Sequence, residues 1–262
     1  MDLHFFNRYQ RQMQLQSFGI EGQQKLAQSK VLIVGMGGLG CPASQYLVGA
    51  GIGKIGLVDG DNIELHNLHR QVLYNTDEVG TSKATVAESK LSALNPSIEI
   101  ESFKEFISTK NVLDIAKDYD IILDGSDRFE TRYLLDTYCT LKNKIYVYGS
   151  VFEFEGQVAL FNYAQNSISY NSIFPNPPNK SSVPTCSENG ILGFLPSIIG
   201  SMQALEVVKY ICAVRNTNDF EFIHYNALTQ EIYKTQASSN PSFVPPKSEQ
   251  DILSFDYDVF CG

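Results

Sequence analysis

Acidic, basic and amide side chains follow one apolar run of the sequence and precede the next amphipathic segment. Asp59 ends the run 55–58, and Asn67, Arg70 and Lys83 come soon after it. Arginine and lysine can neutralise the charge that builds up when a triphosphate is attacked at its α-phosphate and pyrophosphate leaves. This pattern predicts a site for a nucleoside triphosphate.

Two further carboxylates, Asp124 and Asp127, follow the predicted strand at 119–123. Carboxylate oxygens are good ligands for Mg²⁺, so either aspartate could hold the ion that accompanies a nucleotide. Arg70 and Lys83 could instead be solvated surface charges. That alternative is less favoured for the whole set, because all of these residues are expected at one edge of one sheet.

A glycine-rich turn, GMGGLG at residues 35–40, lies between the β-branched run 31–34 and a helical segment. Glycines allow a tight turn and a close approach of the backbone to phosphate, and a helix N-terminus offers free N–H groups. Asp59 ends the next predicted strand, where a carboxylate can accept hydrogen bonds from ribose hydroxyls. The turn therefore predicts nucleotide binding.

Two kinds of nucleotide-binding enzyme contain such a turn. An NAD-dependent oxidoreductase is the usual one, but a nicotinamide cofactor does not need two cations and an amide beyond the second strand. A triphosphate does need them, so Asn67, Arg70 and Lys83 favour an ATP-using enzyme, with the oxidoreductase as the alternative.

Strands and helices alternate through the first part of the chain. Strands are expected at 31–34, 55–58, 98–103, 119–123 and 145–148, and helices at 41–50, 83–93 and 128–141. This alternation predicts an α/β fold with a Rossmann-like, doubly wound and mostly parallel sheet.

The regular alternation of predicted strands and helices ends after residue 149. The segment 157–161 indicates an antiparallel strand, 164–190 a long mobile crossover loop, 196–214 a helix, 219–234 two strand-like runs, and the last 25 or so residues a polar tail. We expect a single domain over 1–262, with a nucleotide-binding half at 1–150 and an antiparallel half at 151–262.

Composition excludes some classes of protein. The 20 Lys and Arg against 29 Asp and Glu give a net charge of −9, which argues against a nucleic-acid partner. The sequence has no apolar run long enough for a membrane helix and no signal-like start, so a cytoplasmic location is expected. Its 5 cysteines form no C-x-x-C pair, which disfavours a disulfide framework or a cysteine zinc site.

Taken in order, the motifs resemble the MoeB/ThiF/HesA group of ubiquitin-activating-enzyme-like adenylyltransferases. They are 8–12 (RYQRQ), 34–40 (VGMGGLG), 59–61 (DGD), 67–71 (NLHRQ), 80–83 (GTSK), 126–127 (SD), 183–193 (VPTCSENGILG) and 256–262 (DYDVFCG). The resemblance covers most of the chain, and its joint pattern is highly specific.

The resemblance implies adenylylation, with Mg-ATP, of the C-terminal glycine of a ubiquitin-like sulfur carrier protein that ends in Gly-Gly. The carrier would be ThiS-like, for thiamin, or MoaD-like, for molybdopterin, and the motifs do not separate these branches. The sulfur donor, a cysteine desulfurase or a rhodanese, is likewise open. Other classes remain as alternatives: a non-catalytic carrier-docking module, or an ATP-dependent enzyme that acts on a modified tRNA base, which the acidic net charge disfavours.

The resemblance also implies roles for individual residues. The implied ATP-binding set is Gly37, Gly38, Gly40, Asp59, Asp61, Asn67, Arg70, Lys83 and Asp127, with Asp127 linked to Mg²⁺. The implied catalytic set is Arg11, Arg70, Lys83, Asp127 and Cys186. Arg11 would act on the site of the other subunit of a homodimer, and the Cys186 thiol could form a covalent link to the carrier. Cys41, Cys139 and Cys212 are expected to pack in the core.

Two features depart from the family. Many relatives bind zinc with two C-x-x-C pairs, where this chain has SYNS at 169–172 and SNPS at 239–242. A serine hydroxyl stays protonated near neutral pH and is a poor zinc ligand, so we expect no zinc and a region held by packing alone. The usual asparagine after the metal-linked aspartate is replaced by Arg128, which leaves the local contact there open.

Overall fold

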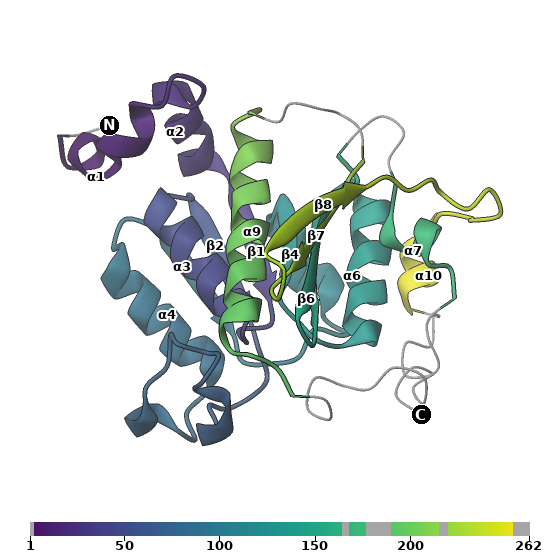
Figure 1. Cartoon of the computed structure of the whole chain (residues 1–262), viewed down its shortest axis with the longest axis horizontal. Helices are drawn as coiled ribbons and strands as arrows, with labels where there is room; N and C mark the ends of the chain where they lie inside the picture. The colour runs from purple at the N-terminus through teal and green to yellow at the C-terminus, as the bar shows by residue number, and fades with distance from the viewer. Residues whose placement is uncertain (1–2, 164–167, 177–189, 215–219, 254–262) are drawn as a thin grey trace.

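Eight strands form one sheet in the computed structural model, which describes residues 3–163, 168–176, 190–214 and 220–253 (Figure 1). The strand order is β3-β2-β1-β4-β5-β6-β7-β8; the first five are parallel and the last three are added antiparallel. The strands are β1 (Lys30–Val34), β2 (Lys54–Val58), β3 (Glu99–Phe103), β4 (Ile121–Asp124), β5 (Ile145–Phe152), β6 (Glu155–Phe161), β7 (Phe222–Asn226) and β8 (Glu231–Thr235). The doubly wound sheet with an antiparallel extension is thus confirmed.

Helices cover both faces of the sheet. The long ones are α1 (Leu3–Met13), α2 (Gly19–Gln28), α3 (Gly40–Ala50), α4 (Lys83–Leu94), α6 (Phe129–Lys142) and α9 (Phe194–Ile211). The short ones are α5 (Val112–Ile115), α7 (Tyr170–Ile173), α10 (Glu249–Leu253) and the 3-10 turns η1 (Leu65–Asn67), η2 (Thr76–Glu78) and η3 (Ala116–Asp118). None of the helices in the described ranges is long and apolar enough to span a membrane.

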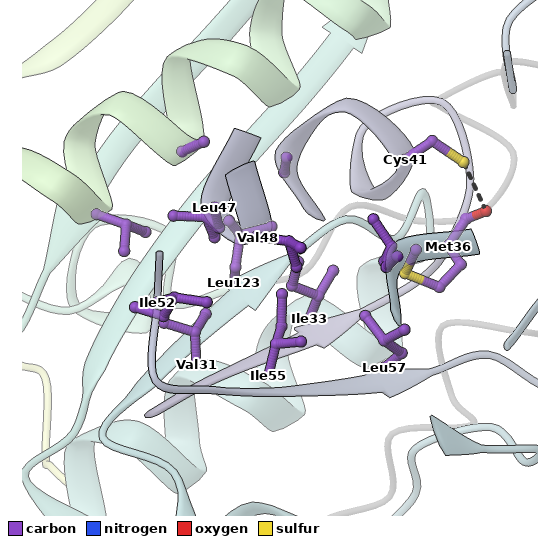
Figure 2. Packing of buried hydrophobic residues seen from close by; sticks show 14 of the residues in the cluster. Val31, Ile33, Met36, Cys41, Leu47, Val48, Ile52, Ile55, Leu57 and Leu123 are labelled. Atoms are coloured by element: carbon purple, nitrogen blue, oxygen red, sulfur yellow. Dashed lines mark hydrogen bonds between the residues drawn. The ribbon is translucent and has the colours of Figure 1, made fainter. Parts of the chain in front are cut away.

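The central strands are buried on both faces, which explains their unbroken apolar runs. Val31 and Ile33 of β1 face the core under α3, α4 and α9, whereas Leu32 and Val34 face the core under α5 and α6. Figure 2 shows the first of these cores, with Val31, Ile33, Ile55 and Leu57 of β1 and β2 gathered below Leu47 and Val48 of α3. Cys41, Cys139 and Cys212 are buried, as expected of core cysteines.

Element boundaries differ from the predictions in the second half. Helix α9 ends at Ile211 rather than 214, because Ala213 adopts a left-handed conformation with φ 56°. Strand β5 continues through residue 150, so the sheet is continuous across the two predicted halves. The predicted loop at 164–190 contains the short helix α7, and the polar tail contains α10; residues 164–167, 177–189 and 254–262 lie outside the described residues.

The two Ser-x-x-Ser segments lie side by side and are joined by hydrogen bonds. The hydroxyls of Ser172 and Ser239 are 3.1 Å apart, and the Asn240 N–H donates to the Ser172 carbonyl at 2.7 Å. Ser169 accepts from the Ser172 N–H and so caps α7. The expectation that packing alone holds this region is therefore wrong: hydroxyl and backbone hydrogen bonds contribute as well.

A buried carboxylate anchors the same region to the sheet-covering helix α6. Asp136 is fully buried and accepts the backbone N–H groups of Tyr170 and Asn171 at 2.8 and 2.9 Å. Burial raises the pKa of Asp136 from 3.8 to about 7, although these hydrogen bonds oppose the shift. Asp136 therefore binds its proton more tightly in the folded protein than in the unfolded chain.

The raised pKa of Asp136 predicts a pH dependence of stability. Between about pH 4 and pH 7 the folded protein holds a proton that the unfolded chain has released, so this contribution to the free energy of unfolding falls as pH rises. Urea unfolding should be measured for the wild type and for Asp136→Asn at several pH values. The free energy of unfolding of the wild type minus that of Asp136→Asn should fall as the pH rises through this window. The exposed Asp114→Asn variant should give a constant difference; a constant difference for Asp136→Asn would contradict the prediction.

Candidate active site

A cavity of about 690 Å³ opens at the carboxyl ends of β1, β2 and β4. Ligands of open α/β sheets bind at this edge, because loops with free N–H groups and helix N-termini meet there. The sequence-predicted residues that line the cavity are Gly37, Gly38, Asp59, Asp61, Asn67, Arg70, Lys83 and Asp127. The fold thus brings together side chains that are distant in the sequence.

The glycine-rich turn is packed against the loop that follows β4. Gly35 has φ +93°, and a Cβ there would lie 2.7 Å from the carbonyl carbon of Gly125. A Cβ on Gly40 would lie 1.9 Å from the Gly35 carbonyl oxygen. Gly37 and Gly38 face the cavity, whereas Gly40 begins α3 beneath the turn and is not among the described residues that line it. The turn therefore requires glycine for packing as well as for ligand approach.

Asp59 is held in place by backbone donors. Its two carboxylate oxygens accept the N–H groups of Met36 and Asp61 at 2.7 and 2.8 Å. Burial raises the pKa of Asp59, and the nearby charge of Lys83 counteracts this. Each oxygen can still accept a second hydrogen bond, so the fixed carboxylate suits the hydroxyls of a ribose.

Lys83 reaches the cavity because the β2–α4 connection folds back on itself. Asn62 and Ser82 form an isolated β-bridge, and the Lys83 N–H donates to the Asp61 carbonyl at 3.0 Å. The Lys83 ammonium then donates to the Asp61 carboxylate at 3.1 Å, with the lysine side chain 7% and the aspartate side chain 51% exposed. A buried cation is thus aimed at the cavity beside an exposed carboxylate.

Asn67 and Arg70 form a second polar pair on the turn that includes η1. The Arg70 guanidinium donates to the Asn67 side-chain oxygen at 2.8 Å and to the His66 carbonyl at 3.3 Å. These hydrogen bonds restrict the arginine to a narrow range of rotamers. Arg70 therefore presents a preorganised charge to the same cavity as Lys83.

The two aspartates after β4 have different environments. Asp124 is fully buried; it accepts from the Ser126 N–H and hydroxyl and from the Tyr146 hydroxyl, and Arg132 lies 4.0 Å away. Burial raises the pKa of Asp124, against the charge of Arg132. Asp127 is exposed and lines the cavity, so of the two aspartates it is the one whose carboxylate could hold Mg²⁺ there. No group of three His, Cys, Asp or Glu that could hold a metal occurs among the described residues.

Sequence reasoning did not single out Gln71, although it belongs to the quoted NLHRQ motif. Gln71 is 3% exposed and lines the cavity, and its Oε1 atom has no hydrogen-bond partner within the described part of the chain. A buried amide oxygen without a partner is costly, so it marks a place where a bound ligand can donate. Its position directly after Arg70 was the one feature of the sequence that could have marked Gln71 as a site residue.

Two members of the implied catalytic set are not placed in this cavity. Arg11 is exposed on α1 and is not one of the cavity-lining residues in the described ranges. Helix α1 packs against α2, and α2 contacts the C-terminal end of α9 through Gly22 and Cys212. The cavity lies at the opposite, N-terminal end of α9, so α1 is far from it (Figure 1). Cys186 falls outside the described residues.

Comparison with known proteins identifies the family. The model of the ThiF family matches residues 9–243. A sulfur carrier protein adenylyltransferase of Thermus thermophilus is 39% identical over 98% of this chain and 96% of its own length. A probable molybdopterin-synthase adenylyltransferase of Porphyra purpurea is 42% identical over 87% of this chain, which spans 59% of that protein.

A solved structure shares the fold. The crystal structure of Escherichia coli MccB with ATP has a TM-score of 0.79 and 23% identity, and the match covers 94% of this chain and 76% of that one. The family model matches most of the chain, and a relative is 39% identical over nearly the whole of both proteins. This chain therefore belongs to the ThiF family.

Proposed function

We propose that this protein uses ATP to adenylylate the C-terminal glycine of a ubiquitin-like sulfur carrier protein ending in Gly-Gly, with release of pyrophosphate. The observation that carries the proposal is the gathering of Asp59, Arg70, Lys83 and Asp127 around one cavity beside the glycine-rich turn. The name of the Thermus relative, which matches this chain over nearly its whole length, supports the same reaction.

The reaction needs charge stabilisation more than proton transfer. A carrier carboxylate oxygen attacks the α-phosphorus, the bond from that phosphorus to the bridging oxygen breaks, and the electron pair leaves with pyrophosphate. The carboxylate is already ionised at neutral pH, so no general base is required. Lys83 and Arg70 would offset the charge on the leaving group, and Asp127 would hold Mg²⁺, which neutralises phosphate charge when bound.

The assembly around this site is also part of the proposal. Because Arg11 lies away from its own cavity, it would complete the site of a second copy in a homodimer. The carrier would be ThiS-like or MoaD-like, serving thiamin or molybdopterin synthesis. A cysteine desulfurase or a rhodanese would supply sulfur to the adenylated carrier.

Exchange of labelled pyrophosphate into ATP tests the proposed reaction. The purified protein should catalyse exchange only with Mg²⁺ and a carrier that ends in Gly-Gly, and a carrier lacking the last glycine is the control. Absence of exchange with a folded protein that binds the carrier would favour a docking module. Binding of NAD without binding of ATP would favour the oxidoreductase.

Cys186 and adenylylation are expected to be separable. A thiol can take the acyl group from the adenylate by nucleophilic attack, but it has no part in forming the adenylate. The Cys186→Ala variant should keep its pyrophosphate exchange rate within about twofold, and any loss should fall on transfer of sulfur to the carrier. A loss of exchange comparable to that of a phosphate-binding variant would contradict this order of events.

A further inference from the structure

A cation–aromatic contact joins two loops that follow strands far apart in the sheet. The Arg128 guanidinium lies 4.6 Å from the centre of the Phe106 ring, and both residues line the cavity. Phe106 follows β3 and Arg128 follows β4, with β2 and β1 between them. Neighbouring strands are about 4.8 Å apart, so β3 and β4 are separated by roughly 14 Å. The two side chains therefore meet across the carboxyl ends of β2 and β1.

The contact lies at the nucleoside end of the cavity. A Cβ on Gly60 would come within 2.7 Å of the Phe106 ring, so this ring lies against the backbone next to Asp59. Asp59 is the carboxylate whose geometry suits a ribose, and a base attached to that ribose must lie near the same stretch of backbone. Phe106 and Arg128 are therefore placed to meet the base of a bound nucleotide.

Arg128 is a poor choice for the local structure. It occupies the N-cap position of the 14-residue helix α6, and its side chain makes no capping hydrogen bond to the described chain. Asparagine, aspartate, serine or threonine is favoured at this position, and a cation is disfavoured by the positive end of the helix dipole. Residues that break a local rule are expected at functional sites, which makes Arg128 a candidate for a ligand contact.

We propose that Arg128 and Phe106 form the binding surface for the adenine base, with the guanidinium between the Phe106 ring and the adenine ring. This inference rests on the proposed use of ATP. A guanidinium is planar and stacks on aromatic faces. Arg128 is exposed and lines the cavity, so its guanidinium is accessible to a ligand there. Arg128 then recognises the base, while Arg70 and Lys83 bind the phosphates.

The test compares ligands that share the base but differ in phosphates. Equilibrium dialysis with labelled adenosine, AMP and ATP gives Kd values for the wild type, Arg128→Asn and Phe106→Leu, and calorimetry gives the Tm of each ligand-free protein. Arg128→Asn should weaken all three ligands by a similar factor of about 10. Its ligand-free Tm should rise, because asparagine can cap α6. Lys104→Asn removes an exposed cation from the same loop as Phe106 and should change none of these values.

Each other outcome overturns the inference. Weaker binding of ATP with unchanged binding of adenosine would assign Arg128 to the phosphates. Unchanged affinities with a lower Tm would make the contact purely structural. If the wild type catalyses carrier-dependent pyrophosphate exchange but both variants bind adenosine normally, only the base-binding role fails. If the wild type binds none of the three ligands, the proposed function fails with it.

Discussion

Replacing Lys83 with alanine is expected to reduce carrier-dependent pyrophosphate exchange by at least about 100-fold, which is the effect of removing one preorganised charge from a reaction that generates negative charge. The Lys83 ammonium is buried, points into the cavity and is held by Asp61 at 3.1 Å. Alanine at the start of α4 is a good helix former, so the fold should be retained. Exchange kinetics and Tm, measured on the same preparation, separate the two effects.

Lys90→Ala is the matched control for Lys83→Ala. Lys90 lies on the same helix and forms a comparable ion pair, with Glu78 at 2.7 Å, but it is not among the described residues that line the cavity. Its removal should leave the exchange rate within about twofold of the wild type. An unchanged rate in folded Lys83→Ala would remove this lysine from the mechanism.

The second large effect concerns stability rather than activity. Asp124→Asn should lower the free energy of unfolding by about 3 kcal/mol, because it leaves the buried Arg132 cation without its opposite charge. Arg132 and Asp124 have side-chain exposures of 7% and 0%, so water cannot replace the lost partner. For a chain of this size the loss corresponds to a fall in Tm of roughly 6–12 °C. Urea and thermal unfolding measure both quantities.

Asp127→Asn separates the roles of the two aspartates after β4. Asp127 is exposed, so its replacement should change the free energy of unfolding by no more than about 0.5 kcal/mol. If Asp127 holds Mg²⁺, the variant should need a higher Mg²⁺ concentration for exchange.

For the Asp124→Asn variant, a stability equal to that of the wild type would contradict the prediction. It would mean that the Asp124 charge is not needed to balance Arg132.

The sheet could be predicted from sequence because its central strands are apolar on both faces. The run 31–34 has no polar face, and its residues divide between the two cores in the structure. Helix ends were less predictable, since α9 stops where Ala213 takes a left-handed conformation that alanine rarely adopts. The anchoring of α7 by Asp136 was invisible as well, because it joins positions more than thirty residues apart.

Much of the candidate site could also be predicted, because parallel strands bring their carboxyl ends to one edge. Asp59, Arg70 and Lys83 do line one cavity there. Sequence spacing could not distinguish the buried Asp124 from the exposed Asp127, since that difference is made by Tyr146 and Arg132 from other elements. Nor could it show that Asp61 would hold Lys83, which depends on the bridge between Asn62 and Ser82.

The close approach of the glycine-rich turn to the loop after β4 limits how this sequence can diverge. A Cβ on Gly35, Gly40 or Gly125 would come within 1.9–2.7 Å of backbone atoms of the other loop or of the turn itself. Backbone cannot rotate away as a flexible side chain can, so no neighbouring substitution restores the space. None of the three positions can accept a side chain without a backbone shift, so a library of single substitutions selected for function should be depleted at all three.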